Sequence, residues 1–91
     1  MASERIYMTE NIKMNIVKSL GIVAKNDKGY TKELNIISWN DGSPKFDLRQ
    51  WTPDDHRALK GITLSDHEMI LLYKILQHYY KNIEEQEVAN G

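Results

Sequence analysis

The 91-residue sequence contains no cysteine. This absence excludes disulfide scaffolds, thiolate zinc sites and thiol nucleophiles. The sequence also has no apolar run near the roughly 20 residues that span a bilayer. Its first residues, Met1 to Arg5, lack the apolar stretch of a signal peptide. We therefore expect a cytoplasmic protein with no membrane partner. A chain of this length fits one domain with a thin core, and such domains often gain stability by oligomerising.

Residues that could carry catalysis are few. The three histidines are His56, His67 and His78. His67 and Glu68 begin like a zinc-protease motif, but Leu71 stands where that motif needs its second histidine. Residues 54–56 carry two aspartates and a histidine that could hold a cation, although a solvated loop is the simpler interpretation. The sequence has no glycine-rich phosphate loop. We expect a protein that is not an enzyme, with no metal, no cofactor and no small-molecule substrate.

The formal net charge of −1 hides an uneven distribution. Residues 11–52 contain seven Lys/Arg against four Asp/Glu, and residues 61–91 contain two against five. The first segment is a mild cation, which a dimer would double, and the second is a mild anion. So weak a field also fits an ordinary solvated surface, so charge alone leaves both interpretations open.

Alternating apolar and polar residues predict a sheet. The predicted strands are 13–24, 30–39, 45–51 and 61–64. In the first strand, Ile16, Leu20 and Ile22 share one parity and indicate one half-buried face. Turn signals at residues 26–29 and 40–44 separate the first three strands.

The strand from Lys45 to Trp51 has the clearest alternation. Phe46 and Leu48 are expected to face the core. The opposite face would then present Lys45, Asp47, Arg49 and Trp51. Single-strand binders combine cations that follow the backbone with aromatics on which bases stack. This row, with Trp39 and Tyr30 on the preceding strand, predicts such a surface. The alternative is that both tryptophans pack at the sheet margin with their indole N–H groups in water.

A long helix is predicted to begin at Ser65, because Ser65 and Glu68 form a capping box. Apolar residues then recur at steps of three and four and make a broad stripe. We expect part of this stripe to cover the helix's own sheet and part to meet a second subunit; one wide core face is the alternative. The expected dimer interface consists of Met69, Leu72, Ile75, Leu76, Tyr79 and Ile83. Residues 1–12 are expected to be flexible, 13–83 to form the domain, and 84–91 to be a disordered acidic tail.

Two motifs in fixed order resemble one family. Residues 44–51, Pro-Lys-Phe-Asp-Leu-Arg-Gln-Trp, are followed after a loop by residues 60–65, Lys-Gly-Ile-Thr-Leu-Ser. This pattern resembles the transcriptional positive cofactor 4 family of single-stranded-DNA-binding coactivators, whose hallmark is an apolar-Asp-apolar-Arg strand, an aromatic, a loop and Lys-Gly-apolar-Ser/Thr-Leu before one helix. Residues 29–35 and 38–40 look like the bacterial YdbC-like branch. The resemblance covers about residues 13 to 83.

The resemblance implies an α+β fold: a curved four-stranded antiparallel β-sheet followed by one C-terminal helix, with two subunits dimerising through their helices. It also implies a groove that holds single strands or melted duplex. The implied nucleic-acid contacts are Tyr30, Lys32, Trp39, Lys45, Arg49, Trp51 and Lys60. Arg49 and Lys60 match the family motif directly. Coactivation is not expected to carry over, because this sequence lacks the Ser/Lys-rich tail of eukaryotic members.

The expected function is therefore sequence-nonspecific binding of single-stranded DNA, or of RNA or melted duplex, by a homodimer. Such a module would serve transcription, replication or repair in the nucleoid-associated cytoplasm of a bacterium. The alternative is a protein-interaction module that binds no nucleic acid.

Overall fold

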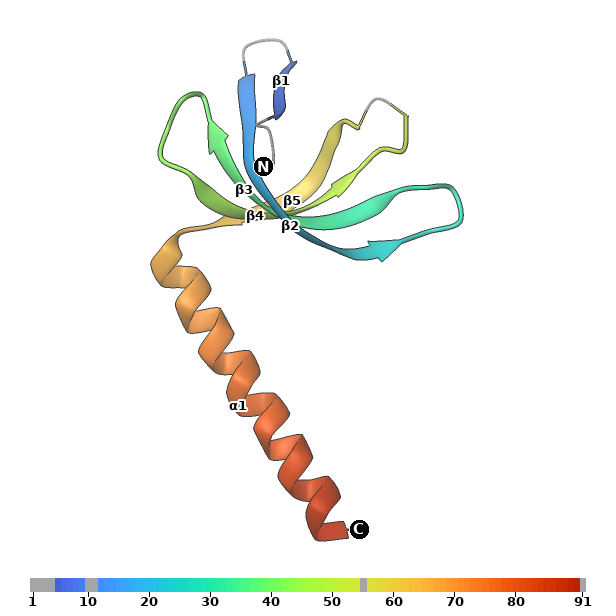
Figure 1. The fold of residues 1–91 in the computed structure, drawn as a ribbon, viewed down its shortest axis with the longest axis vertical. Helices are drawn as coiled ribbons and strands as arrows, with labels where there is room; N and C mark the ends of the chain where they lie inside the picture. Colours follow the sequence, from blue (N-terminus) through green and yellow to red (C-terminus); the bar gives the residue numbers. More distant parts are fainter. Residues whose placement is uncertain (1–4, 10–11, 55, 91) are drawn as a thin grey trace.

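A computed structural model of the chain describes residues 5–9, 12–54 and 56–90. It contains one antiparallel sheet with strand order β1-β2-β3-β4-β5, followed by one helix (Figure 1). The elements are β1 (Arg5–Thr9), β2 (Ile12–Lys25), β3 (Thr31–Trp39), β4 (Lys45–Trp51), β5 (Ala58–Leu64) and α1 (Asp66–Asn90). The predicted α+β class, an antiparallel sheet leading into one C-terminal helix, is confirmed. The four predicted strands are β2 to β5.

Strand β1 adds a fifth strand that the sequence interpretation missed. Residues 5–9 pair with residues 12–16 of β2, from Arg5 opposite Ile16 to Thr9 opposite Ile12. The segment 1–12, which we expected to be flexible, therefore contains a strand; its residues 1–4, 10 and 11 lie outside the described residues. Isoleucine, tyrosine and threonine favour strands, and a pairing partner lies directly beside them.

Strand β2 is irregular, and this overturns one predicted face. Its pairing with β3 slips by one residue between Ile16 and Lys18, again between Ser19 and Gly21, and again between Ile22 and Ala24. Each slip inserts one extra residue, a β-bulge, which bends and twists the strand. The parity that grouped Ile16, Leu20 and Ile22 is therefore interrupted at Leu20, which falls within a slip, whereas Ile16 and Ile22 lie opposite Ile37 and Glu33, two residues of equal parity. Ile16 is 3% exposed, whereas Leu20 is 40% and Ile22 64% exposed.

The sheet has two faces of different character. Side chains of directly opposite residues point to the same side. The inner face carries most of the buried residues, namely Met14, Ile16, Asn35, Ile37, Asp47 and Trp51, whereas the buried Ser38 has the opposite parity. The outer face carries Leu34 opposite Leu48, Ile36 opposite Phe46, and Ile62 opposite Leu48. Trp39 and Ala58 pack against the inner core.

The burial of the two faces of β4 is therefore the reverse of the expectation. The side chains alternate as predicted, but Asp47 and Trp51 are 0% exposed, whereas Phe46 and Leu48 are half-buried. The prediction of an exposed row ending in Trp51 is wrong. Alternation divides a strand into two sets of side chains, and the bend of the sheet decides which set is enclosed.

Two of the hairpin turns fold as their residues dictate. Between β3 and β4, Asn40 and Asp41 both adopt positive φ, and Gly42 N donates to Trp39 O at 2.9 Å, the pattern of a type I′ turn. Between β2 and β3, the side-chain oxygen of Asn26 accepts hydrogen bonds from the backbone N–H groups of Lys28 and Tyr30. Both turns are therefore held by local hydrogen bonds.

The capping box predicted at the helix start is confirmed. Ser65 N donates to Glu68 Oε1 at 2.8 Å, and Glu68 N donates to Ser65 Oγ at 3.2 Å. The backbone hydrogen bond from Ser65 is the main cause that lowers the pKa of the Glu68 carboxyl below its ordinary value. Helix α1 continues through residues 84–90, which we expected to form a disordered tail. Glutamate and glutamine are good helix formers, so the helical register continues.

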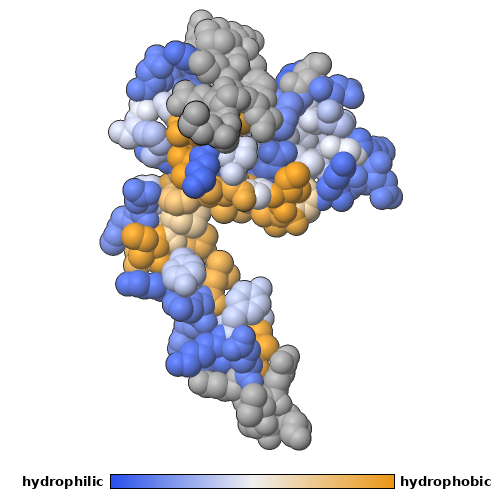
Figure 2. All heavy atoms as spheres, in the orientation of Figure 1, coloured by the Kyte–Doolittle hydropathy of each residue, from blue (hydrophilic) through white to orange (hydrophobic). Residues whose placement is uncertain are grey.

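Helix α1 projects away from the sheet instead of lying across it (Figure 1). Among the described elements it approaches β4 and β5 alone, at its first turns. The apolar stripe of the helix is thus left open, with Ile75 65%, Leu76 45% and Tyr79 56% exposed. Figure 2 shows this apolar surface running along the helix and continuing onto the side of the sheet from which the helix leaves.

Candidate nucleic-acid interface

Trp39 and Arg49 form the centre of the candidate site. Trp39 ends β3, and Arg49 lies on β4; both side chains belong to the inner face, because Ile37 pairs with Lys45 and Glu33 with Arg49. The guanidinium carbon of Arg49 lies over the Trp39 ring, 5.0 Å from its centroid, in a cation–π contact. Trp39 is half-buried, so part of its surface stays open to a ligand.

Arg49 is held firmly by its own chain. Its Nε and Nη2 atoms donate to the two carboxylate oxygens of Asp47, both at 2.9 Å, and its Nη1 donates to Leu59 O at 2.8 Å. Thr63 Oγ1 donates to Asp47 at 3.1 Å. The Asp47 side chain is 0% exposed and that of Arg49 only 15%. The predicted contact residue Arg49 thus has a carboxylate partner that offsets its charge.

Trp51 lies deeper on the same face. Its ring meets the ring of His56 edge-on, with centroids 4.6 Å apart and an interplanar angle of 87°. His56 Nε2 lies 3.4 Å from Glu33 Oε2, and Thr31 Oγ1 donates to the same carboxylate. Because Trp51 is 0% exposed, its faces are covered by protein, and it serves as a core residue.

Two buried donors on β3 have no hydrogen-bond partner among the described residues. They are the indole N–H of Trp39 and the side-chain amide nitrogen of Asn35. Asn35 is 1% exposed and pairs with Asp47 across the strands, so it lies directly beside the Arg49 network. The sequence interpretation missed Asn35, since a polar residue in a strand normally marks the solvated face.

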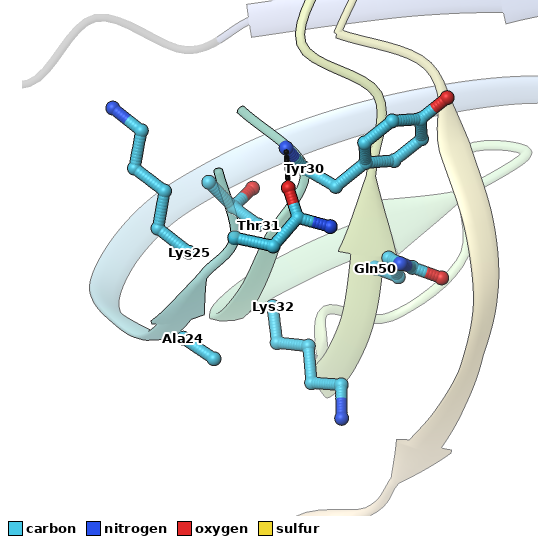
Figure 3. A pocket seen from close by; sticks show the side chains of 7 residues that line it. Ala24, Lys25, Tyr30, Thr31, Lys32 and Gln50 are labelled. Atoms are coloured by element: carbon cyan, nitrogen blue, oxygen red, sulfur yellow. Dashed lines mark hydrogen bonds between the residues drawn. The ribbon is translucent and has the colours of Figure 1, made fainter. Parts of the chain in front are cut away.

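Lysines gather at the end of the sheet away from the helix start. Lys32 and Lys60 line a hollow of about 290 Å³ with Leu48, Arg49 and Gln50. A neighbouring hollow of about 280 Å³ also contains Lys32 and Gln50, and its other lining residues are Ala24, Lys25, Asn26, Tyr30 and Thr31 (Figure 3). In Figure 3, Lys25 and Lys32 point to opposite sides of the strands. Within the described part of the chain, Lys25, Lys32 and Lys60 form no ion pair.

The predicted contacts therefore fall into two groups. Trp39, Lys45, Arg49 and Trp51 belong to the inner face, whereas Lys32, opposite Gln50, lies on the outer face. Lys60 lines a hollow with Lys32, and Tyr30 lines the second hollow. Gln50 and Lys25 were missed, although the pairing of Gln50 with Lys32 brings it directly beside a predicted cation.

Among the described residues, no group of three or more His, Cys, Asp or Glu side chains could hold a metal ion. The described residues also contain no helix that is both long and apolar enough to cross a membrane.

Comparison with known proteins identifies a relative of this chain. None of the known protein-family models matches the chain. An uncharacterized protein of Treponema pallidum (strain Nichols) is 30% identical over 69 residues, which cover 76% of this chain and 81% of that protein. At that identity and coverage, the chain belongs to the same family as the Treponema pallidum protein.

Proposed function

We propose that the protein binds single-stranded nucleic acid on its sheet, without sequence preference, as a homodimer in the nucleoid-associated cytoplasm. The observation that carries this proposal is a half-open tryptophan, Trp39, with a fixed guanidinium over its ring on the inner face, which also carries the exposed Lys45. Lys32, on the outer face, lines a hollow with Lys60. Aromatic faces accept any base, and cations follow the phosphates, which is how sequence-tolerant binders work.

The lysines supply the electrostatic part of the proposed binding. Lys32, Lys45 and Lys60 are exposed, and within the described residues none of them forms an ion pair. Each cation that meets a phosphate releases condensed counterions, so affinity falls as salt rises. Lys13 provides a contrast, because its Nζ already pairs with Asp41 at 2.9 Å.

The homodimer is supported by apolar surface that one chain leaves open. Large apolar side chains on α1 and on β5 are about half exposed, including Ile62 at 56%, Ile70 at 52% and Ile75 at 65%. Monomers seldom show continuous apolar patches of more than a few hundred Å². A second copy would cover the helix stripe and the adjoining sheet surface, which are continuous in Figure 2.

The direct test is a fluorescence titration with oligo-dT, a duplex and an RNA of equal length. We expect salt-dependent binding of both single strands and weaker binding of the duplex. Trp39→Ala should lose about 1–3 kcal/mol with the slope against salt unchanged. Lys60→Ala and Lys32→Ala should each flatten that slope by about 0.7, the value for one phosphate contact on a single strand. Lys13→Ala is the matched control and should leave the slope as in the wild type.

A protein-interaction module is the second candidate, favoured by one open strand edge. Among the described residues, β1 pairs with β2 from Ile12 to Ile16, and Leu20, Ile22 and Val23 further along β2 are exposed. An unpaired, partly apolar edge is a template for strand addition by another polypeptide. Failure of the wild type to bind any of the oligonucleotides, at low salt and while folded, would favour this candidate over the first.

A further inference from the structure

We infer that Arg49 is a positioning residue, which holds the Trp39 ring for stacking and does not bind phosphate itself. This inference rests on the proposed function and concerns which residues of that site bind phosphate and which one positions the stacking ring. It reverses the role that the sequence pattern predicts for Arg49, since a cation in a single-strand binder is ordinarily a phosphate contact.

The guanidinium of Arg49 is already occupied by hydrogen bonds within the protein. A guanidinium has five N–H donors in a rigid plane. Three of its nitrogens already donate: Nε and Nη2 to Asp47, and Nη1 to Leu59 O, all between 2.8 and 2.9 Å. The bidentate pair with Asp47 fixes the plane, and the bond to Leu59 O ties it to β5. Only 15% of the side chain is exposed, so little of it can reach a phosphate.

The charge of Arg49 is already balanced by Asp47. Asp47 is fully buried, and its two carboxylate oxygens accept the hydrogen bonds of Arg49 and one more from Thr63 Oγ1. A phosphate approaching Arg49 would meet a guanidinium whose charge is already balanced at 2.9 Å. Lys32, Lys45 and Lys60 are exposed and form no ion pair within the described residues, although the charge of Lys45 also acts on the Glu68 carboxylate, so they are more available to a phosphate than Arg49 is.

The contacts of Trp39 indicate that Arg49 orients its ring. Its indole N–H has no hydrogen-bond partner among the described residues, so hydrogen bonding does not set the angle of the ring. The Trp39 side chain contacts the core, and the guanidinium carbon of Arg49 lies over its ring, 5.0 Å from the centroid. Because Arg49 is itself fixed by Asp47, the cation–π contact transmits that rigidity to the ring. A ring held in advance loses less freedom when a base stacks on it.

The test measures oligo-dT affinity against salt for Arg49→Lys, Trp39→Ala and the double variant. Arg49→Lys keeps a positive charge beside Asp47 but loses the planar fork. We expect it to weaken binding about 3- to 10-fold with the salt slope unchanged. Trp39→Ala should weaken binding about 5- to 150-fold, the range for losing one stacked base. The double variant should bind like Trp39→Ala alone, because Arg49 acts through that ring.

A control variant separates this role from phosphate binding. Lys45→Ala removes an exposed cation from the same strand and the same face. It should flatten the salt slope by about 0.7, as expected for one phosphate contact on a single strand. Because Arg49→Lys keeps its charge, the slope comparison uses Arg49→Gln, and a slope for that variant that flattens as much as that of Lys45→Ala would overturn the inference. Additive losses in the double variant would overturn it as well.

A measurement on the wild type avoids any variant that folds poorly. With ¹⁵N-labelled arginine, the Nε–H signal of Arg49 should be protected from exchange in the free protein and should keep its position when oligo-dT binds. With fluorinated tryptophan, the Trp39 signal, assigned with Trp39→Phe, should move on binding. A shift of the Arg49 Nε–H signal to that of a phosphate-bound guanidinium would sink the inference while leaving the proposed function intact. A wild type that binds no oligonucleotide would instead refute the proposed function.

Discussion

Gly61 is the position where a single added carbon should do most damage. A Cβ placed there would lie 2.5 Å from Arg49 Cβ, 2.6 Å from Leu48 O and 2.7 Å from Arg49 Cα. Two of these three atoms belong to the backbone of β4, which cannot move aside without opening the β4–β5 pairing. Gly61→Ala should therefore force β5 away from β4 at the point where Arg49 is bonded to Leu59 O.

The magnitude follows from two effects. Overpacking a close contact costs about 1–3 kcal/mol, and loss of a hydrogen bond to a charged group costs about 1.5–3 kcal/mol. Since β5 can relax in part, we expect a loss of about 2–4 kcal/mol in the free energy of unfolding. For a domain of this size each kcal/mol corresponds to about 4–8 °C in Tm, so the shift should be large in a thermal scan.

Gly21→Ala is the matched control. Gly21 lies in β2, and an added Cβ there would meet nothing within 4 Å. This variant should be neutral or stabilised by about 0.4–1 kcal/mol, because alanine restricts the unfolded chain. Urea unfolding of both variants at one protein concentration provides the measurement, since dimerisation would make stability depend on concentration. If Gly61→Ala unfolds within 0.5 kcal/mol of Gly21→Ala, the close approach of β5 to β4 is not as described, and the reasoning fails.

Three further predictions concern the helix and the buried ion pair. Leu76→Asp should halve the mass seen by sedimentation, because a charge in an apolar interface is costly; a wild type that sediments as a monomer would contradict the dimer. The lowered pKa of Glu68 means that its contribution to stability is present above its ordinary value of 4.5 and is lost as pH falls through the lower folded value. Glu68→Gln should therefore remove part of the acid sensitivity of α1 in circular dichroism, and an unchanged acid transition would count against the capping role. Asp47→Ala should cost about 3–5 kcal/mol, because Arg49 is left without its buried partner, and a variant that melts like the wild type would refute this.

Local features were readable from the sequence because neighbouring residues decide them. The capping box of Ser65 and Glu68, the turn at 40–44 and the extent of β4 depend on short-range hydrogen bonds and alternation. The register of β2 was not readable, because its three bulges leave no mark in the pattern of apolar residues. Ile22, which resembles a core residue in the sequence, is 64% exposed although it lies opposite Glu33, on the same side of the sheet as Ile16.

The candidate site shows the same difference between what the sequence determines and what the tertiary structure determines. The sequence by itself determined which chemical groups are present: the cations, the two tryptophans and the helix stripe all stand at fixed positions in the chain. Only the tertiary structure decided which of them is available. It buried Trp51 and Asp47, left Trp39 half-open beside Arg49, and put Lys32 on the face opposite to both. The physical reason is that alternation sorts side chains into two faces, whereas the bend of the whole sheet and long-range pairs such as Asp47 with Arg49 choose which face is enclosed and which charges stay free.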